Sequence, residues 1–187
     1  MNYFEVFDIE PILNLDLKGL ERKFHELSRK HHPDYHTDRP EGERQDALEM
    51  TALLNDAYRT LKNPTARAEY LIQTQGLSID RSKVPQSLLM EVFEINEELD
   101  RLRSTRQSGG DVQAMMDNLR DFQRQISDKR NSYDRQLEQA FTEWDHLVSK
   151  PDAEEKRRQH LSKLIDIISQ SSYIRNLERD IEEEVSQ

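Results

Sequence analysis

An amphipathic helix ends at the sequence Arg29-Lys30-His31-His32-Pro33-Asp34. Proline disfavours helical geometry in the residue before it and lacks an amide hydrogen, so Pro33 predicts the end of this helix. Upstream, apolar or ring-bearing side chains recur at steps of three and four residues, as they do on one face of a helix. The positions on this face are Leu17, Leu20, Phe24, Leu27 and His31. Asp16 precedes them and is the expected N-cap.

The opposite face of this helix is basic. Residues 17–31 contain five bases and two acids, within a chain whose formal net charge is -10. The bases are Lys18, Arg22, Lys23, Arg29 and Lys30. A local reversal of sign in an acidic chain predicts that this face binds an acidic partner surface.

The composition favours well-solvated helices over a thick globular core. Hydrophobic and charged residues each make up 34% of the 187 residues, and there are only five glycines. A chain of this length allows one or two domains. Because cysteine is absent, disulfides and thiolate metal sites are excluded. A sequence pI near 5.1 argues against binding to nucleic acid.

Membrane and export signals are not found in the sequence. There is no run of about 18 apolar residues, which argues against a membrane span. Residues 1–25 lack both the apolar core of a signal peptide and an Arg-rich, acid-poor presequence. We therefore expect a cytoplasmic protein that does not enter a membrane.

A second helix is predicted to return beside the first one. Pro40 suits the first turn of a helix, and side chains at helical spacing follow it. They are Ala47, Leu48, Thr51, Leu54, Tyr58 and Leu61. The two helices can pack antiparallel through these faces. Residues 3–7 form a short apolar segment before the pair, and Asn63-Pro64 begins a short helix that Gly76 can cap at its end.

Three longer helices are predicted in the second half of the chain. They are expected over about 86–107, 112–150 and 152–185. Breaks at Ser108-Gly109-Gly110 and Lys150-Pro151 separate them, and Asp111 is a potential cap. Such short connections make consecutive helices antiparallel neighbours, so the region is predicted to be a three-helix bundle. Strand patterns are absent, and the expected fold class is all-α.

The first of these helices carries more apolar residues than one buried face requires. At about 100° per residue, five of them fall within a sector of roughly 80° that can face a bundle core. These five are Leu88, Val92, Ile95, Leu99 and Leu102. Leu89 and Phe93 point away from this sector, and Met90, Glu94 and Glu97 lie nearly opposite it. An apolar cluster bordered by acids is a candidate binding surface, and burial of Leu89 and Phe93 by neighbouring helices is an equally open alternative.

Residues 20–34 resemble the second helix and His-Pro-Asp loop of a J domain. This is the module by which J-protein co-chaperones trigger ATP hydrolysis in seventy-kilodalton heat-shock chaperones. Residues 54–64 and 67–71 are similar to the close of a J domain, and residues 3–7 to its short first helix. The resemblance implies a J domain over residues 1–76, built as a helical hairpin with two short helices.

The J-domain resemblance implies a chaperone-binding site at the end of the basic helix. Its implied residues are His32, Pro33, Asp34, Arg22, Lys23, Arg29 and Lys30. The bases attract an acidic chaperone surface, and Pro33 restricts the loop so that docking removes little further freedom. Many relatives have a basic residue directly after His-Pro-Asp. This chain has Tyr35 there, so we expect its positive surface to end sooner.

A J domain followed by a helical domain of this size resembles the HscB, or Jac-type, co-chaperones of iron–sulfur cluster biogenesis. In that family a Leu-Met-x-x-Leu-Glu-x-x-Glu pattern binds the cluster scaffold, an IscU-type protein. Residues 89–97 match this pattern, with Phe93 where leucine is usual, and Tyr173 stands in the setting of a family aromatic. The implied scaffold-binding residues are Leu89, Met90, Phe93, Glu94, Glu97 and Tyr173. They belong to an implied scaffold-binding bundle over 85–187, after a linker at 77–84.

The function implied by this resemblance is that of a co-chaperone with no enzymatic activity, cofactor or metal of its own. Its implied partners are an HscA-like chaperone and an IscU-like scaffold. General J proteins carry a Gly/Phe-rich segment and Cys-x-x-Cys zinc repeats after the J domain. This chain has neither, which favours a dedicated client, and a J protein with another client is the alternative.

A metal-dependent hydrolase is the alternative from another functional class. The richest set of potential ligands consists of His25, His31, His32, Asp34 and His36. The proline loop splits this set, and no matching group of His and Asp residues stands on a later helix. A purely structural helical adaptor would leave the His-Pro-Asp sequence without an explanation.

Overall fold

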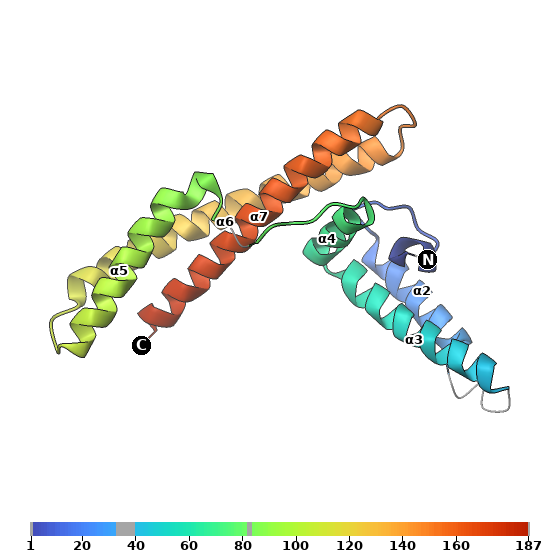
Figure 1. Cartoon of the computed structure of the whole chain (residues 1–187), viewed down its shortest axis with the longest axis horizontal. Coiled ribbons are helices and arrows are strands. Elements are labelled where there is room, and N and C mark those ends of the chain that lie inside the picture. The colour runs from blue at the N-terminus through green and yellow to red at the C-terminus, as the bar shows by residue number, and fades with distance from the viewer. Residues whose placement is uncertain (1, 33–39, 82–83, 187) are drawn as a thin grey trace. The chain divides into compact units, whose positions relative to one another are not determined.

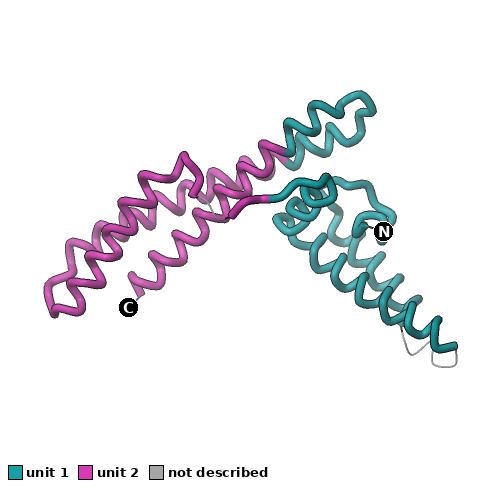
Figure 2. Tube along the Cα trace, in the orientation of Figure 1, with its two compact units in different colours: residues 1–78, 141–161 teal, residues 79–140, 162–187 magenta. Residues whose placement is uncertain are grey.

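The computed structural model describes residues 2–32, 40–81 and 84–186. All the secondary-structure elements assigned in this part of the chain are helices, which confirms the all-α prediction. The chain divides into two compact units, which Figure 2 shows in different colours. Unit 1 contains residues 1–78 and 141–161, and unit 2 contains residues 79–140 and 162–187. Unit 1 therefore combines the beginning of the chain with a much later segment.

Unit 1 is built on two antiparallel helices, α2 (Leu17–Lys30) and α3 (Glu41–Lys62), which lie side by side (Figure 1). Two short helices, α1 (Tyr3–Val6) and α4 (Pro64–Thr74), also pack against α3. This arrangement confirms the predicted helical hairpin with two short helices.

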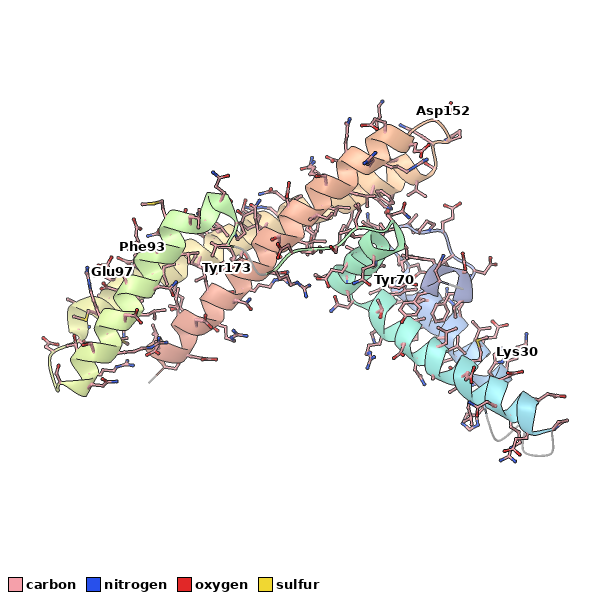
Figure 3. All side chains as sticks on the ribbon, in the orientation of Figure 1. Lys30, Tyr70, Phe93, Glu97, Asp152 and Tyr173 are labelled. Atoms are coloured by element: carbon pink, nitrogen blue, oxygen red, sulfur yellow. The ribbon has the colours of Figure 1, made fainter. Side chains whose placement is uncertain are left out.

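Stacked aromatic rings join the elements of unit 1. Phe24 of α2 and Tyr58 of α3 have ring centroids 4.3 Å apart, and those of Tyr3 of α1 and Tyr70 of α4 are 4.2 Å apart. The Tyr70 hydroxyl also accepts a hydrogen bond from the Tyr3 amide at 2.9 Å (Tyr70 is labelled in Figure 3). Both the ring and the backbone of Tyr3 therefore hold α1 to α4.

Two leucines of the predicted apolar faces, Leu17 and Leu48, are exposed. Leu17 is the first residue of α2, and helical side chains lean toward the N-terminus, so its side chain extends past the end of the helix. Leu48 lies about 120° around α3 from the buried Leu54, outside the sector that faces α2. Helical spacing alone therefore predicted a wider buried face than the hairpin has.

Caps predicted from the sequence occur at three helix ends. Asp16 accepts a hydrogen bond from the Lys18 amide at 3.1 Å, and Asp111 accepts one from the Gln113 amide at 2.9 Å. Gly76 follows α4 with a φ of +74°, the left-handed conformation in which glycine commonly ends a helix.

Unit 2 is the predicted three-helix bundle, formed by α5 (Leu89–Gln107) with parts of α6 (Gln113–Val148) and α7 (Glu154–Val185) (Figure 1). A single 3-10 turn, η2 (Gln86–Leu88), precedes α5. All five residues assigned to the core sector from the sequence are buried in one hydrophobic cluster. The buried residues that α6 and α7 add to this cluster are Leu119, Ile126, Ile174, Leu177 and Ile181.

Buried acids of unit 2 pair with bases from a neighbouring helix. Glu184 of α7 accepts hydrogen bonds from Arg103 at 2.6 Å and from Arg106 at 3.2 Å. Glu178 accepts one from Arg130 of α6 at 2.9 Å. The hydrogen bond and the charge of Glu184 raise the pKa of Arg103 above its ordinary value. These pairs join α5 and α6 to α7 beside the apolar core.

Candidate functional site

The basic face of α2 lies at the surface of unit 1. Arg22, Arg29 and Lys30 are all exposed there, and Figure 3 shows Lys30 at the end of α2. Arg22 lies 3.6 Å from the Asp16 carboxylate, but these two side chains are 73% and 69% exposed. An ion pair so open to water contributes little to stability. Three of the four bases predicted to attract a chaperone thus stand at the surface.

The fourth base, Lys23, has a structural contact. Its ammonium donates hydrogen bonds to the carbonyls of Phe7 at 2.7 Å and Asp8 at 2.8 Å. Asp8 follows α1 with a φ of +47°, a left-handed conformation that is uncommon for residues other than glycine. Lys23 therefore holds the turn after α1 against α2. The sequence pattern gave no sign of this contact, because the basic face predicts a solvated side chain.

The residues that lead into the His-Pro-Asp sequence continue from the end of α2. His31 is the C-cap residue of α2. His32 is exposed, and its amide donates a hydrogen bond to the Arg29 carbonyl at 3.4 Å. Pro33 and Asp34 lie outside the described residues. His32 is thus the member of the predicted chaperone-binding triplet that the structure places, and it lies at the surface.

The apolar cluster predicted on α5 is exposed. Leu89 is 49% exposed, Met90 is 70% exposed and Phe93 is 65% exposed, although Leu88 and Val92 beside them are buried. The alternative in which neighbouring helices bury Leu89 and Phe93 is therefore wrong for this fold. Large apolar side chains that are exposed together are typical of binding surfaces. We call Leu89, Met90 and Phe93 the apolar cluster of α5.

Acids border this cluster, as the sequence predicts. Phe93 and Glu97, one helical turn apart, project from the same side of α5 (Figure 3). Glu94 and Glu97 line a groove of about 430 Å³ between α5 and α6. The other residues that line the groove are Glu98, Arg101, Asn118, Asp121, Phe122 and Gln125. Glu97 also forms an ion pair with Arg101, so its carboxylate is oriented along the helix.

Tyr173 comes from α7 and is half-buried. Its ring packs against the hydrophobic cluster of unit 2. Figure 3 shows it on α7, a different helix from the one that carries Phe93 and Glu97. Its side chain therefore contributes to the bundle core, and only part of it is at the surface.

Contacts that the sequence did not indicate hold the loop before α2 to the end of α6, within unit 1. The Trp144 indole donates a hydrogen bond to the Pro11 carbonyl at 2.8 Å. The Asp145 carboxylate accepts hydrogen bonds from the amides of Leu13 at 2.6 Å and Asn14 at 2.9 Å. We call this set of contacts the loop clamp.

Arg67 of α4 also holds this loop, through the carbonyl of Leu13. Its guanidinium donates hydrogen bonds to the carbonyls of Leu13 and Leu61, and its side chain is buried. Burial lowers the pKa of Arg67, and the negative charge of Asp145 opposes this shift. A buried cation is tolerated where acceptors surround it, so this arginine serves the fold of unit 1.

The ligands considered for a metal site are not gathered in the described part of the chain. No group of three His, Cys, Asp or Glu side chains suited to a metal ion occurs there. Asp34 and His36, two members of the candidate set, lie outside these residues. Among the described residues, moreover, no helix is both long and apolar enough to cross a membrane.

Comparisons with known proteins match both halves of the chain. A family model described as DnaJ domain matches residues 2–70, and one described as HSCB C-terminal oligomerisation domain matches residues 84–182. A Neisseria meningitidis protein named co-chaperone protein HscB homolog is 33% identical over 147 residues, which cover 77% of this chain and 84% of that protein.

Solved structures with the same fold cover nearly the whole chain. Chaperone HscB from Vibrio cholerae is 27% identical with a TM-score of 0.62, covering 98% of this chain and 96% of that one. The human co-chaperone protein HscB, at 23% identity, shows the fold alone, with a TM-score of 0.64 over 97% of this chain and 81% of that one.

Proposed function

Because the chain belongs to the HscB family of J-domain co-chaperones, we propose that it couples two partners. It stimulates the ATPase of an HscA-like chaperone and brings an IscU-like iron–sulfur scaffold to it for cluster transfer. In this proposal residues 1–76 act as the J domain, 77–84 as a linker and 85–187 as the scaffold-binding domain. The observation that carries the proposal is the exposure of the apolar cluster of α5, beside residues of the same helix that are buried.

At the chaperone end, the surface bases of α2 attract an acidic surface of the ATP-bound chaperone. Such attraction raises the association rate and weakens with salt. Lys23 adds to the positive potential but serves the turn after α1 as well. His32, Pro33 and Asp34 then contact the chaperone and favour its hydrolysis-competent arrangement. The residues that hydrolyse ATP belong to the chaperone.

At the scaffold end, exposed apolar side chains of α5 act as anchors. The proposed scaffold-binding residues are Leu89, Met90, Phe93, Glu94, Glu97 and Tyr173. Anchors of this kind cost about 2 kcal/mol or more of binding energy each when they are truncated. The acids at the edge of the cluster orient the scaffold, since charged groups at a rim contribute more to register than to affinity.

The experiment that tests this function is a titration with an IscU-like scaffold. We expect saturable binding by the wild type, and loss of binding when Leu89, Met90 and Phe93 are all replaced by alanine. The matched control replaces three exposed leucines of unit 1, Leu17, Leu48 and Leu77, by alanine. Circular dichroism checks that all three proteins are helical.

The outcome of this titration separates two functions. Binding that the α5 variant loses and the control variant keeps supports the scaffold-binding role. If the wild type fails to bind the scaffold but still stimulates the chaperone ATPase, the protein serves another client and the proposed scaffold site is wrong.

A further inference from the structure

We infer that Thr51 is a positioning residue for His32, and that it acts through the peptide bond between His31 and His32. The inference rests on the proposed function of His32 at the chaperone. The Thr51 hydroxyl oxygen lies 3.0 Å from the His31 carbonyl oxygen and 2.8 Å from the Ala47 carbonyl oxygen. The first of these contacts joins α3 to the end of α2.

The two carbonyls next to Thr51 differ in how they depend on it. Inside α3 the Ala47 carbonyl is four residues before Thr51, so regular helix geometry gives it the Thr51 amide as a donor. Carbonyls at the C-terminal end of a helix rely instead on donors from outside that helix. A threonine hydroxyl has one hydrogen to donate. When Thr51 donates to the His31 carbonyl, it therefore supplies a hydrogen bond that no backbone amide of α2 supplies.

This hydrogen bond acts on the peptide unit that leads directly into His32. The carbonyl of the unit belongs to His31 and accepts from Thr51 at 3.0 Å, while its amide belongs to His32 and donates to the Arg29 carbonyl at 3.4 Å. The second distance exceeds the usual range for such bonds, about 2.7–3.2 Å. The Thr51 bond is therefore the shorter of the two.

Control of this one peptide unit fixes how the backbone enters His32. A peptide unit is planar, so a bond that orients its carbonyl also orients its amide. The proline that follows restricts the backbone of His32 on the other side. The His32 side chain is exposed, and the backbone beneath it is constrained from both directions. Thr51 supplies the constraint that comes from α3.

The test measures the chaperone ATPase against the concentration of the full-length protein. Thr51→Val removes the hydroxyl at nearly constant volume. We expect it to lower the maximal stimulation about fivefold, the effect of one neutral hydrogen bond. The concentration that gives half-maximal stimulation depends on the basic face of α2 and should not change. Thr51→Ser keeps the hydroxyl and should restore the stimulation.

The matched control is Thr60→Val, the same substitution nearer the other end of α3. All measurements are made well below the melting temperatures, so unfolding does not lower the signal. The inference is overturned if Thr51→Val stimulates as well as the wild type or no worse than Thr60→Val. It is also overturned if Thr51→Ser loses as much as Thr51→Val. If the wild type itself gives no stimulation, or His32→Gln stimulates normally, the proposed function fails instead.

Discussion

The proposed binding surfaces on α2 and α5 differ in how far the fold itself uses their side chains. On α2, Lys23 holds the turn after α1, while Arg29 on the same helix is exposed. On α5, the exposed Phe93 stands two residues from Ile95, which is buried. An ammonium group can bind a backbone carbonyl or a partner's acid, whereas an exposed apolar side chain gains little free energy from folding. On α5, therefore, exposure distinguishes the proposed binding residues from those that stabilise the fold. On α2 this distinction is less clear, because Lys23 belongs to both groups.

The largest expected effect comes from His32→Gln. We expect it to abolish stimulation of the chaperone ATPase while the melting temperature stays almost unchanged, because His32 is exposed. His25→Gln, at an exposed histidine within α2, is the control and should stimulate normally. A large drop in melting temperature for His32→Gln would place His32 among the residues that support the fold.

Next in size is the contrast between Phe93→Ala and Ile95→Ala on α5. Phe93→Ala should weaken scaffold binding by about 30-fold, which corresponds to roughly 2 kcal/mol, with little change in the free energy of unfolding. Ile95→Ala should lower the free energy of unfolding by about 2–5 kcal/mol, since it empties a core position. Isothermal titration and urea unfolding measure the two quantities. If Phe93→Ala lost several kcal/mol of stability, Phe93 would be a core residue like Ile95, and its proposed role as a binding residue would be wrong.

Ionic strength should affect binding to the chaperone more strongly than binding to the scaffold. Raising the ionic strength from about 0.05 to 0.5 M shortens the screening length, so association with the chaperone should slow about tenfold. Binding of the scaffold to the apolar cluster of α5 should change much less. Stopped-flow association rates with each partner measure this difference. Equal salt dependence of the two interactions would contradict the assignment of charge to one surface and apolar contact to the other.

The smallest expected effects separate Lys23 from Arg29. Lys23→Ala removes two hydrogen bonds to the turn after α1 and should lower the free energy of unfolding by about 1 kcal/mol. Arg29→Ala should change it by less than about 0.5 kcal/mol, as expected for an exposed side chain. It should instead raise the concentration that gives half-maximal stimulation. Identical stability losses in the two variants would show that Lys23 has no special structural role.

The helices and the apolar cluster of α5 could be predicted from the sequence because local rules determine them. Periodicity placed Leu88 and Ile95 in the bundle core, and the rotation of the helix then turned Phe93 outward. The cap at Asp16 depends only on the residues next to it. Each of these features follows from residues a few positions apart.

Other features of the site could not be predicted because they depend on distant neighbours. The carbonyls that accept from Lys23 belong to a turn in another element. For Tyr173, the polar run before it gives no apolar phase, so its position against the bundle core became visible only in the structure. The loop clamp joins residues more than a hundred positions apart, and nothing in either segment points to the other.

The loop clamp also has a consequence for the order in which the protein is made. The hydrogen bond from Leu13 to Asp145 closes a separation of 132 residues. At about 5–20 residues per second, synthesis of the intervening chain takes on the order of ten seconds. By the end of that time α1 to α4 have been translated, and until then Trp144 and Asp145 are not available to contact the loop before α2. Unit 1 begins at the N-terminus but includes residues 141–161, so it is completed only after α5, α6 and the first turns of α7 have been translated.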